Sequence, residues 1–174
     1  MKFERVLHLV IIITFVLSYH SRVFAQASAT ASASANVIAP ISMVKNVDMN
    51  FGNIAVSVTS GGTVTLVPSG TRTTGGAGGV TLPATAGTVA AASFTVSGNA
   101  SYTYAISLPS AVTINSGTHS MTVSGFSSTP ASTGTLGTGG TQNVTVGAVL
   151  NVGAGQSPGT YTNSSGVPVT VNYN

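Results

Sequence analysis

The residues that could carry acid–base chemistry are few in this sequence. After residue 25, Asp48 is the only acidic side chain and His119 is the only histidine. With one of the many serines they could form a Ser-His-Asp triad, in which the histidine takes the serine proton and the aspartate orients the histidine. A hydrolase that uses two carboxylates is excluded, because it needs a second one. Chance alone supplies one His and one Asp, so we predict no catalytic residues and no enzyme.

Metal and cofactor sites have equally few candidates. Zinc and iron sites use several cysteine, histidine or carboxylate ligands, which the sequence after residue 25 lacks. A calcium site could be built from Asp48, Asn46, Asn50 and backbone carbonyls, although one carboxylate gives weak affinity. The glycine run Gly75–Gly79 has neither the lysine nor the following helix that a phosphate-binding loop needs. We therefore predict no metal site and no cofactor.

Aromatic side chains offer the remaining ligand chemistry, because an exposed ring with polar neighbours can bind a glycan. The candidates are Tyr102, Tyr104, Tyr161 and Tyr173. Their positions in alternating apolar and polar runs place them in the core first. A glycan-binding module would use two flexible loops, which we expect at Thr73 to Gly79 and at Ser127 to Gly140.

Charge is concentrated in the N-terminal leader. Of the five basic and two acidic side chains, only Lys45, Asp48 and Arg72 lie after residue 25. Two cations cannot form the basic surface that nucleic acid requires, so nucleic acid is excluded as a partner. An uncharged surface rich in Ser and Thr repels itself weakly, which makes self-association physically easy.

Residues 1–25 have the pattern of a signal peptide. A short basic start is followed by an apolar run from Val6 to Tyr19, and then by Val23 and Ala25. Signal peptidase accepts such residues at positions −3 and −1, so we expect cleavage after Ala25, with Ala27 as the alternative site. The apolar run is shorter than the roughly 20 residues that span a bilayer. We expect a protein exported to the periplasm, cell surface or exterior, with no membrane span after cleavage.

The segment that follows, residues 26–37, alternates almost without error. Ser, Thr or Asn separates a row of small apolar residues: Ala27, Ala29, Ala31, Ala33, Ala35 and Val37. Strict period-two alternation predicts an extended strand with one face buried, and alanine makes the contacts of that face individually weak. The segment is either the first strand of the domain's own sheet or a detachable strand that completes the sheet of a neighbouring subunit.

The strongest strand pattern lies between Ser93 and Leu108. Large apolar residues occupy alternate positions on both sides of Gly98-Asn99, which predicts a hairpin with its turn at that pair. About ten short strands, regular turn signals and the lack of a helical window indicate an all-β protein. We predict an antiparallel immunoglobulin-like β-sandwich in one domain over residues 26–174, with a small closed β-barrel as the alternative. The chain contains no cysteine.

The chain ends in a predicted strand from Val167 to Tyr173. Pro168 has no N–H to donate, so it restricts the beginning of this strand to a sheet edge or an unpaired position. The residues that we expect to face inward are Val167, Val169, Val171 and Tyr173.

Several short motifs resemble a known bacterial family. They are Asn50-Phe51-Gly52, Phe94-Thr95-Val96 with Tyr102-Thr103-Tyr104, Met121-Thr122-Val123, Val146-Gly147-Ala148, and the ending from Gly159-Thr160-Tyr161 to Val169-Thr170-Val171-Asn172-Tyr173. Over nearly all of the chain after residue 25, they resemble the secreted family called domain of unknown function 4402. The Asn-Phe-Gly motif and the Gly-x-Tyr ahead of a terminal Val-Thr-Val are similar, more distantly, to spore coat protein U and the archaic chaperone-usher pilins. The second resemblance implies an incomplete sandwich that polymerises by donating a strand, although the cysteine pair of those pilins is missing here.

Together these features predict a secreted, non-catalytic structural or adhesive surface protein, in the manner of a fimbrial subunit. Its chemistry would be backbone hydrogen bonding at sheet edges, between the segment Ala27 to Val37 and the strand Val167 to Tyr173. A monomeric extracellular glycan-binding module is the alternative.

Overall fold

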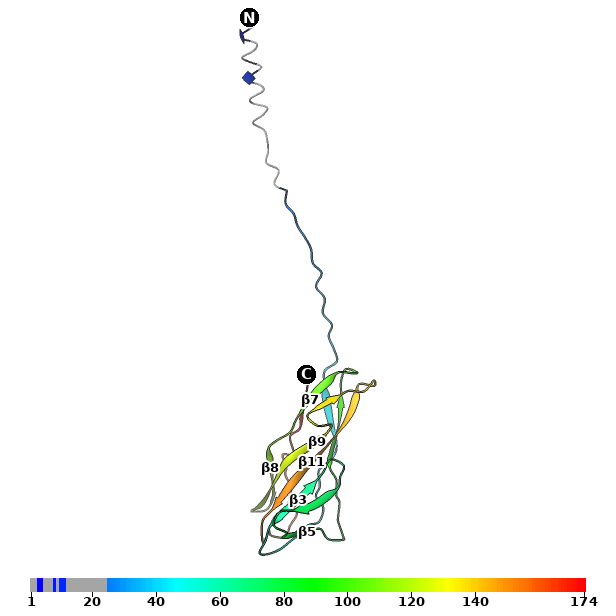
Figure 1. The fold of residues 1–174 in the computed structure, drawn as a ribbon, viewed down its shortest axis with the longest axis vertical. Helices are drawn as coiled ribbons and strands as arrows, with labels where there is room; N and C mark the ends of the chain where they lie inside the picture. Colours follow the sequence, from blue (N-terminus) through cyan, green and yellow to red (C-terminus); the bar gives the residue numbers. More distant parts are fainter. Residues whose placement is uncertain (1–2, 5–7, 9, 12–24) are drawn as a thin grey trace. The chain divides into compact units, whose positions relative to one another are not determined.

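The structure is a computed structural model that describes residues 3–4, 8, 10–11 and 25–174 (Figure 1). Residues 3–4, 8 and 10–11 of the leader are helical, and most of the predicted signal peptide lies outside the described residues. No helix within the described residues is long and apolar enough to cross a membrane. Contacts divide the chain into two units, residues 1–36 and residues 37–174.

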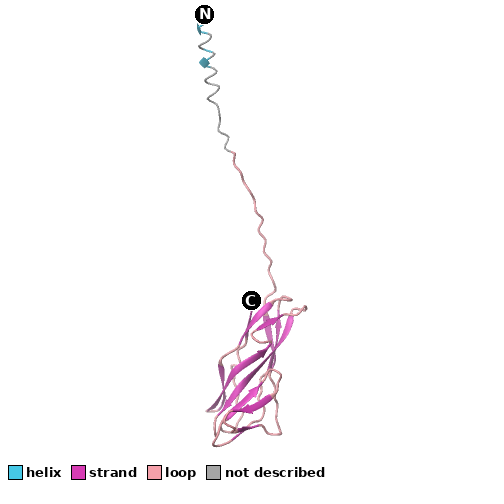
Figure 2. Cartoon of the chain, in the orientation of Figure 1, coloured by secondary structure: helices cyan, strands magenta, loops and turns pink. Residues whose placement is uncertain are grey.

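All regular structure in residues 37–174 is β-strand (Figure 2). The strands in chain order are β1 (Ser42–Val47), β2 (Ala55–Val56), β3 (Gly62–Leu66), β4 (Arg72–Gly75), β5 (Val80–Thr81), β6 (Ala92–Ser97), β7 (Thr103–Ser107), β8 (Ala111–Ser116), β9 (His119–Thr129), β10 (Thr133–Thr135), β11 (Thr141–Val152) and β12 (Thr170–Tyr173).

The strands form one large antiparallel sheet and a smaller one of three strands. In the large sheet, the long strand β11 pairs with β9 along one edge and with β6 and then β3 along the other. The outer strands β1, β4 and β8 pair with β6, β3 and β9. The small sheet has the order β10-β7-β12, and β2 pairs with β5 separately. This arrangement confirms the predicted antiparallel all-β sandwich.

Alternation along the strands builds the core, as the sequence pattern predicted. In β6 every second residue is buried, and the same holds for most of β11. One cluster of buried side chains includes Phe51, Val64, Leu66 and Leu150. A second cluster lies between the large and small sheets and contains Phe94, Val96, Tyr104, Ile106, Leu136, Val144 and Val146.

The predicted hairpin between Ser93 and Leu108 is wrong, although both of its strands exist. β6 belongs to the large sheet and β7 to the small one, so the two strands face each other across the core. The connection between them bonds to the loop before β11 instead: the N–H of Gly98 donates to the carbonyl of Gly140, and the N–H of Ser101 to that of Leu136. Alternation fixed the buried face of each strand correctly, but it does not specify which strand is the neighbour.

The predicted long loop from Ser127 to Gly140 is also partly wrong. Its first residues complete β9, and Thr133–Thr135 forms β10. Ser128 and Leu136 are buried, and the hydroxyl of Ser128 donates to the carbonyl of Pro130. The other predicted loop, Thr73 to Gly79, is half strand, because β4 extends to Gly75.

Candidate strand-pairing site

β1 lies at one edge of the large sheet, and β12 lies at one edge of the small sheet. Hydrogen bonding leads from β1 through β6, β11 and β9 to β8. An isolated bridge joins Asn115 of β8 to Thr162, and eight residues later the same segment pairs with β7 as β12. β1 and β12 each have a strand partner on one side only. Because these two edges are not paired with each other, the sheets curl into a half-barrel, an arrangement that fits a β-sandwich or a barrel-like fold.

The C-terminal segment presents the inner face that the sequence predicted. Val169, Val171 and Tyr173 are partly buried and pack against the second core cluster, while Thr170 and Asn172 are exposed. Val167 is half-buried as well, but the paired strand starts only at Thr170. Pro168 cannot donate to a ladder, which accounts for the unpaired start.

β1 carries an inner face of the same kind on the opposite edge. In the antiparallel register with β6, Met43 lies opposite the buried Val96 and Lys45 lies opposite the buried Phe94. Directly opposed residues share a face of the sheet, so Met43 and Lys45 stand on the inner side. Yet 56% of the Lys45 side chain is exposed, so the inner face is only partly covered at this point.

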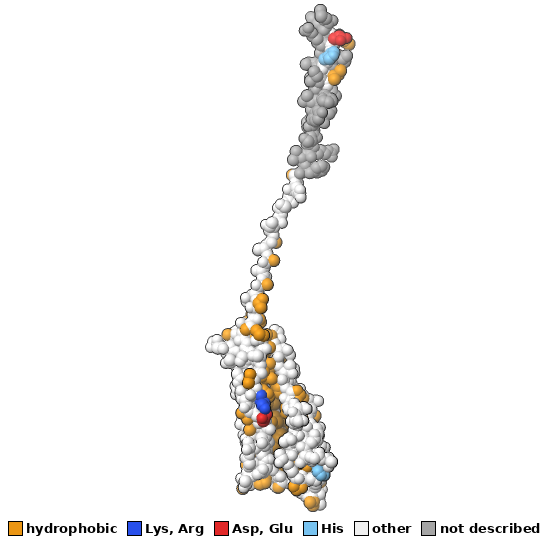
Figure 3. All heavy atoms as spheres, turned by 180° about the vertical axis from the view of Figure 1, so that it is seen from behind, with side chains coloured by type: hydrophobic (Ala, Val, Ile, Leu, Met, Phe, Trp, Pro, Cys, Tyr) orange, Lys and Arg blue, Asp and Glu red, His pale blue; other side chains and the backbone are white. Residues whose placement is uncertain are grey.

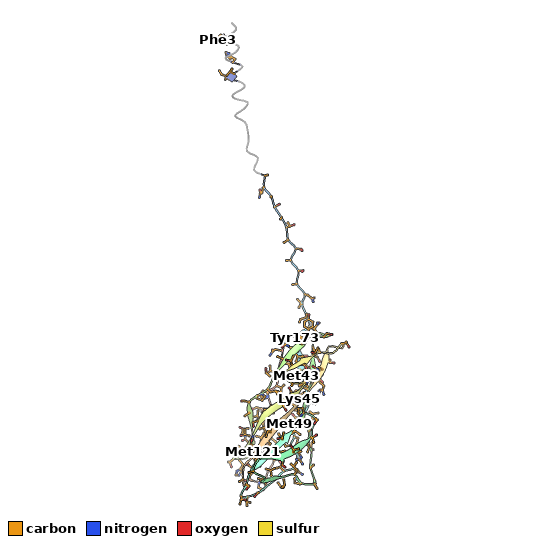
Figure 4. All side chains as sticks on the ribbon, in the orientation of Figure 1. Phe3, Met43, Lys45, Met49, Met121 and Tyr173 are labelled. Carbon is orange, nitrogen blue, oxygen red and sulfur yellow. The ribbon has the colours of Figure 1, made fainter. Side chains whose placement is uncertain are left out.

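A hollow lined by hydrophobic side chains lies beside this exposed stretch. Lys45 forms an ion pair with Asp48, with 2.6 Å between Nζ and Oδ1. Figure 3 shows the pair at the rim of an elongated hollow in which hydrophobic side chains are visible. Met43 and Met49 are partly buried against the core clusters. Figure 4 shows Tyr173, Met43, Lys45 and Met49 following one another away from the end where the chain terminates.

Tyr173 joins the two edges at that end of the domain. Its hydroxyl donates a hydrogen bond to the carbonyl of Ala39 at 3.0 Å and accepts one from the N–H of Asn99 at 2.6 Å. The ring of Tyr102 stands edge-on to that of Tyr173, with 5.7 Å between the ring centroids. The residues that lead into β1 and the last residue of β12 are therefore tied together, whereas the edges beyond them are not.

The alternating N-terminal segment belongs to no strand of the structure. Residues 25–36 have no regular structure and are exposed throughout, and Val37 is 94% exposed. The first strand of the sheet is β1, which begins at Ser42, so the interpretation of residues 26–37 as the first strand differs from the structure. Alanine side chains bury little area, which gives the segment little to gain by packing on its own domain. The predicted pairing residues Ala27, Ala29, Ala31, Ala33, Ala35 and Val37 thus remain outside the sheets.

The residues considered for calcium have separate partners. Asp48 is held by Lys45, the amide of Asn46 donates to the hydroxyl of Thr95, and Oδ1 of Asn50 accepts from the N–H of Gly52. Within the described residues there is no group of three or more His, Cys, Asp or Glu side chains that could hold a metal ion.

The residues considered for a catalytic triad lie on different elements. Asp48 follows β1, whereas His119 opens β9 in the turn opposite Ser116. A Gly-x-Ser-x-Gly spacing around Ser157, which sequence reasoning missed, lies near this turn, because the amide of Gln156 donates to the carbonyl of Ser120. A nucleophile elbow joins a strand to a helix, and here an irregular segment follows.

The tyrosines divide into core and surface. Tyr104 is fully buried, and its hydroxyl donates to Oε1 of Gln142 at 2.7 Å. Burial raises the pKa of Tyr104 above the ordinary value for tyrosine. Tyr102, two residues earlier, is 40% exposed, which corrects the prediction of a core position. It lies just before β7, where its ring is in contact with that of Tyr173 in β12 and is otherwise open to solvent.

The fold is a cysteine-free antiparallel β-sandwich in which β1 and β12 are edge strands. A family model described as Domain of unknown function (DUF4402) matches residues 41–173, and the chain belongs to this family. The match begins at the residue before β1 and ends at the last residue of β12. Comparison with curated proteins and with solved structures gave no match. The more distant resemblance to spore coat protein U and the pilins stays a prediction.

Proposed function

We propose that this protein is an exported, non-catalytic structural or adhesive subunit of the bacterial surface, which assembles by pairing β-strands between copies. The observation that carries the proposal is the segment of residues 26–36. It has the period-two alternation of a half-buried strand, yet it is exposed and pairs with nothing in the described part of its own chain. A strand pattern with an apolar face and no partner is suited to another chain.

Composition supports the same function. Only Lys45, Asp48 and Arg72 are charged after residue 25, and two of these neutralise each other. Copies of the domain therefore repel one another weakly. Exposed edges such as β1 and β12 offer unpaired N–H and C=O groups, which are templates for a further strand. The leader supports export, since its pattern is that of a signal peptide.

The test compares the mature chain 26–174 with a shortened chain that begins at Ile38. We expect the mature chain to form assemblies by light scattering and electron microscopy, and the shortened chain to be monomeric with an unchanged β-type circular dichroism spectrum. The shortened chain should fold, because residues 37–174 form a compact unit by themselves. Equal particle sizes for the two chains would contradict the proposal.

Two matched single substitutions test whether assembly depends on strand pairing or only on the presence of the N-terminal segment. Ala31→Asp places a charge on the alanine face, and Ser32→Asp places the same charge on the opposite face. Burial of an unpaired carboxylate is unfavourable, so Ala31→Asp should abolish assembly. Ser32→Asp should leave most of it intact. If both variants assemble to the same extent, the alanine face is not buried.

One observation favours a glycan-binding module as the second candidate. Tyr102 is 40% exposed and stands edge-on to Tyr173 at the end of the domain where the chain terminates. An exposed ring of this kind can stack on a sugar. Binding on a glycan array that Tyr102→Ala removes, with the fold retained, would favour this function. No binding across the array would speak against it.

A further inference from the structure

Two edge strands border the same buried cluster, β1 of the large sheet and β12 of the small sheet. On the β1 side the Lys45 side chain is 56% exposed, and on the β12 side Val169 and Val171 are only partly buried. Hydrophobic side chains lie in the hollow that runs beside the Lys45–Asp48 pair (Figure 3).

The two ends of this hollow are not equivalent. At one end the hydroxyl of Tyr173 is bonded to the carbonyl of Ala39 and to the N–H of Asn99. Tyr102 packs against the ring of Tyr173 there. A strand entering from this end would have to break these contacts. Toward Met49, away from Tyr173, no such bond between the two edges is found among the described residues.

We infer that the hollow between β1 and β12 accepts the segment Ala27–Val37 of a second copy, and that this segment enters from the end opposite Tyr173. The inference rests on the proposed function and adds the acceptor site and the direction of pairing. The N-terminal end of the donated segment then lies near Tyr173, and its Val37 end lies at the open end of the hollow. Because β12 runs toward Tyr173, the donated strand is antiparallel to it, the more stable arrangement of backbone hydrogen bonds.

Size and length agree with this occupant. Eleven residues from Ala27 to Val37 span roughly 36 Å as a strand, at about 3.3 Å per residue. Five of the six inward side chains are alanines, and they would lie against the larger Met43, Met49 and Val171. Small residues facing large ones fill a shallow space without overpacking.

Entry from the open end has a consequence for assembly. The C-terminal end of the donated segment continues into β1 of its own copy. It does so at the end of the domain where Tyr173 lies, because the Tyr173 hydroxyl donates a hydrogen bond to the carbonyl of Ala39. The Tyr173 end of one copy therefore meets the open end of the next. This is a head-to-tail contact between two different surfaces, and such a contact propagates into a filament or ring. Entry past Tyr173 would instead place like ends together and allow two copies to exchange segments in a closed dimer.

Cysteine cross-linking tests the direction, because the chain contains no cysteine of its own. Two donor variants, Ser28→Cys and Ser34→Cys, label the two ends of the segment on its polar face. Two acceptor variants label the C-terminal segment at exposed positions: Asn172→Cys next to Tyr173, and Ser165→Cys toward the open end. One donor and one acceptor variant of the mature chain are mixed during assembly and treated with a flexible bismaleimide. Each variant alone is the control.

We expect cross-links between Ser28→Cys and Asn172→Cys and between Ser34→Cys and Ser165→Cys, at least tenfold above the two crossed combinations. Stronger cross-links in the crossed combinations would overturn the direction of entry. Assemblies of normal size that cross-link in none of the four mixtures would overturn the acceptor site, while strand-mediated assembly could still hold. A mature chain that stays monomeric by light scattering would overturn both the proposed function and this inference.

Discussion

Replacement of Tyr104 by phenylalanine should change stability in a way that depends on pH. Tyr104 is fully buried, and its hydroxyl donates to Gln142 at 2.7 Å. Tyr104→Phe keeps the ring and removes the donor, which leaves Oε1 of Gln142 without this bond. A hydrogen bond of this kind contributes about 1 kcal/mol to the free energy of unfolding. At neutral pH we expect the variant to be less stable by about 1 kcal/mol, a decrease in Tm of about 3 °C for a domain of this size.

Alkaline pH should reduce the difference in free energy of unfolding between the unsubstituted protein and Tyr104→Phe. Burial raises the pKa of Tyr104 in the folded state above the ordinary tyrosine value of 10.0. Above that pH the unfolded chain releases the phenolic proton and the folded chain keeps it, so the folded state loses relative stability. The contribution of Tyr104 is complete below pH 10 and declines as pH rises toward the raised folded-state pKa. Phenylalanine has no proton to lose.

Urea unfolding followed by circular dichroism at pH 7, 9 and 11 measures this effect. All other residues are common to both proteins, so their contributions cancel in the difference between the two free energies of unfolding. That difference should be constant from pH 7 to 9 and should shrink or change sign at pH 11. A difference that stays constant or grows at pH 11 would show that the Tyr104 hydroxyl is not held in a buried, neutral form.

Two further substitutions test contacts that hold the domain together. Arg72 donates hydrogen bonds to the carbonyls of Phe51, Asn53 and Ala86, so Arg72→Met should lower the free energy of unfolding by about 2–4 kcal/mol. Calorimetry measures this loss. A loss below about 0.5 kcal/mol would mean that water replaces the guanidinium at no cost. A methyl group on Gly134 would meet the Tyr104 hydroxyl and Gln142, whereas one on Gly139 would meet nothing within 4 Å. Gly134→Ala should therefore destabilise the domain by about 1–3 kcal/mol in the same urea titration, and Gly139→Ala should have little effect. Equal losses of stability in the two variants would contradict the close packing of β10 on Tyr104.

Local patterns predicted the strands well where the turn between two strands is tight. Ser116-Gly117 is a pair typical of a turn, and β8 and β9 pair across it, with Gly117 at a φ of +59°. The sequence alternation of Val144, Val146, Ala148 and Leu150 likewise matches the buried face of β11. In these cases the residues that decide the structure are adjacent in sequence, so pattern and structure agree.

Pairing between distant strands could not be predicted in the same way. The run from Ser93 to Leu108 looks like a hairpin, but its halves join different sheets, because β1 and β11 are the partners of β6. A pleated strand with one apolar face fits many neighbours equally well, and only the complete set of strands selects among them. The same limit applies to residues 127–140, where polar composition indicated a loop and the pairing of β10 with β7 produced a short strand.

One feature of the candidate site could be predicted from the sequence, and another could not. The alternation of residues 26–37 is visible in the sequence, and Val169, Val171 and Tyr173 were correctly expected to face inward. The hydrogen bond between Tyr173 and Ala39, which closes one end of the hollow, joins residues 134 positions apart and has no local signal. The position of Lys45 on the inner face could not be predicted from the sequence either, because it depends on the strand register that places Lys45 opposite Phe94.

The alanine face also indicates how strongly copies should associate. Burial of one methyl group contributes about 0.8 kcal/mol, so five alanines supply about 4 kcal/mol. Loss of translational and rotational freedom on association costs about 4–15 kcal/mol. Apolar contacts alone therefore do not hold a donated strand, and the backbone hydrogen bonds along β12 must supply the remainder. These bonds depend on main-chain geometry rather than on side-chain identity, so the proposed association needs few ionisable groups, and the alternating side chains of the segment would supply its specificity.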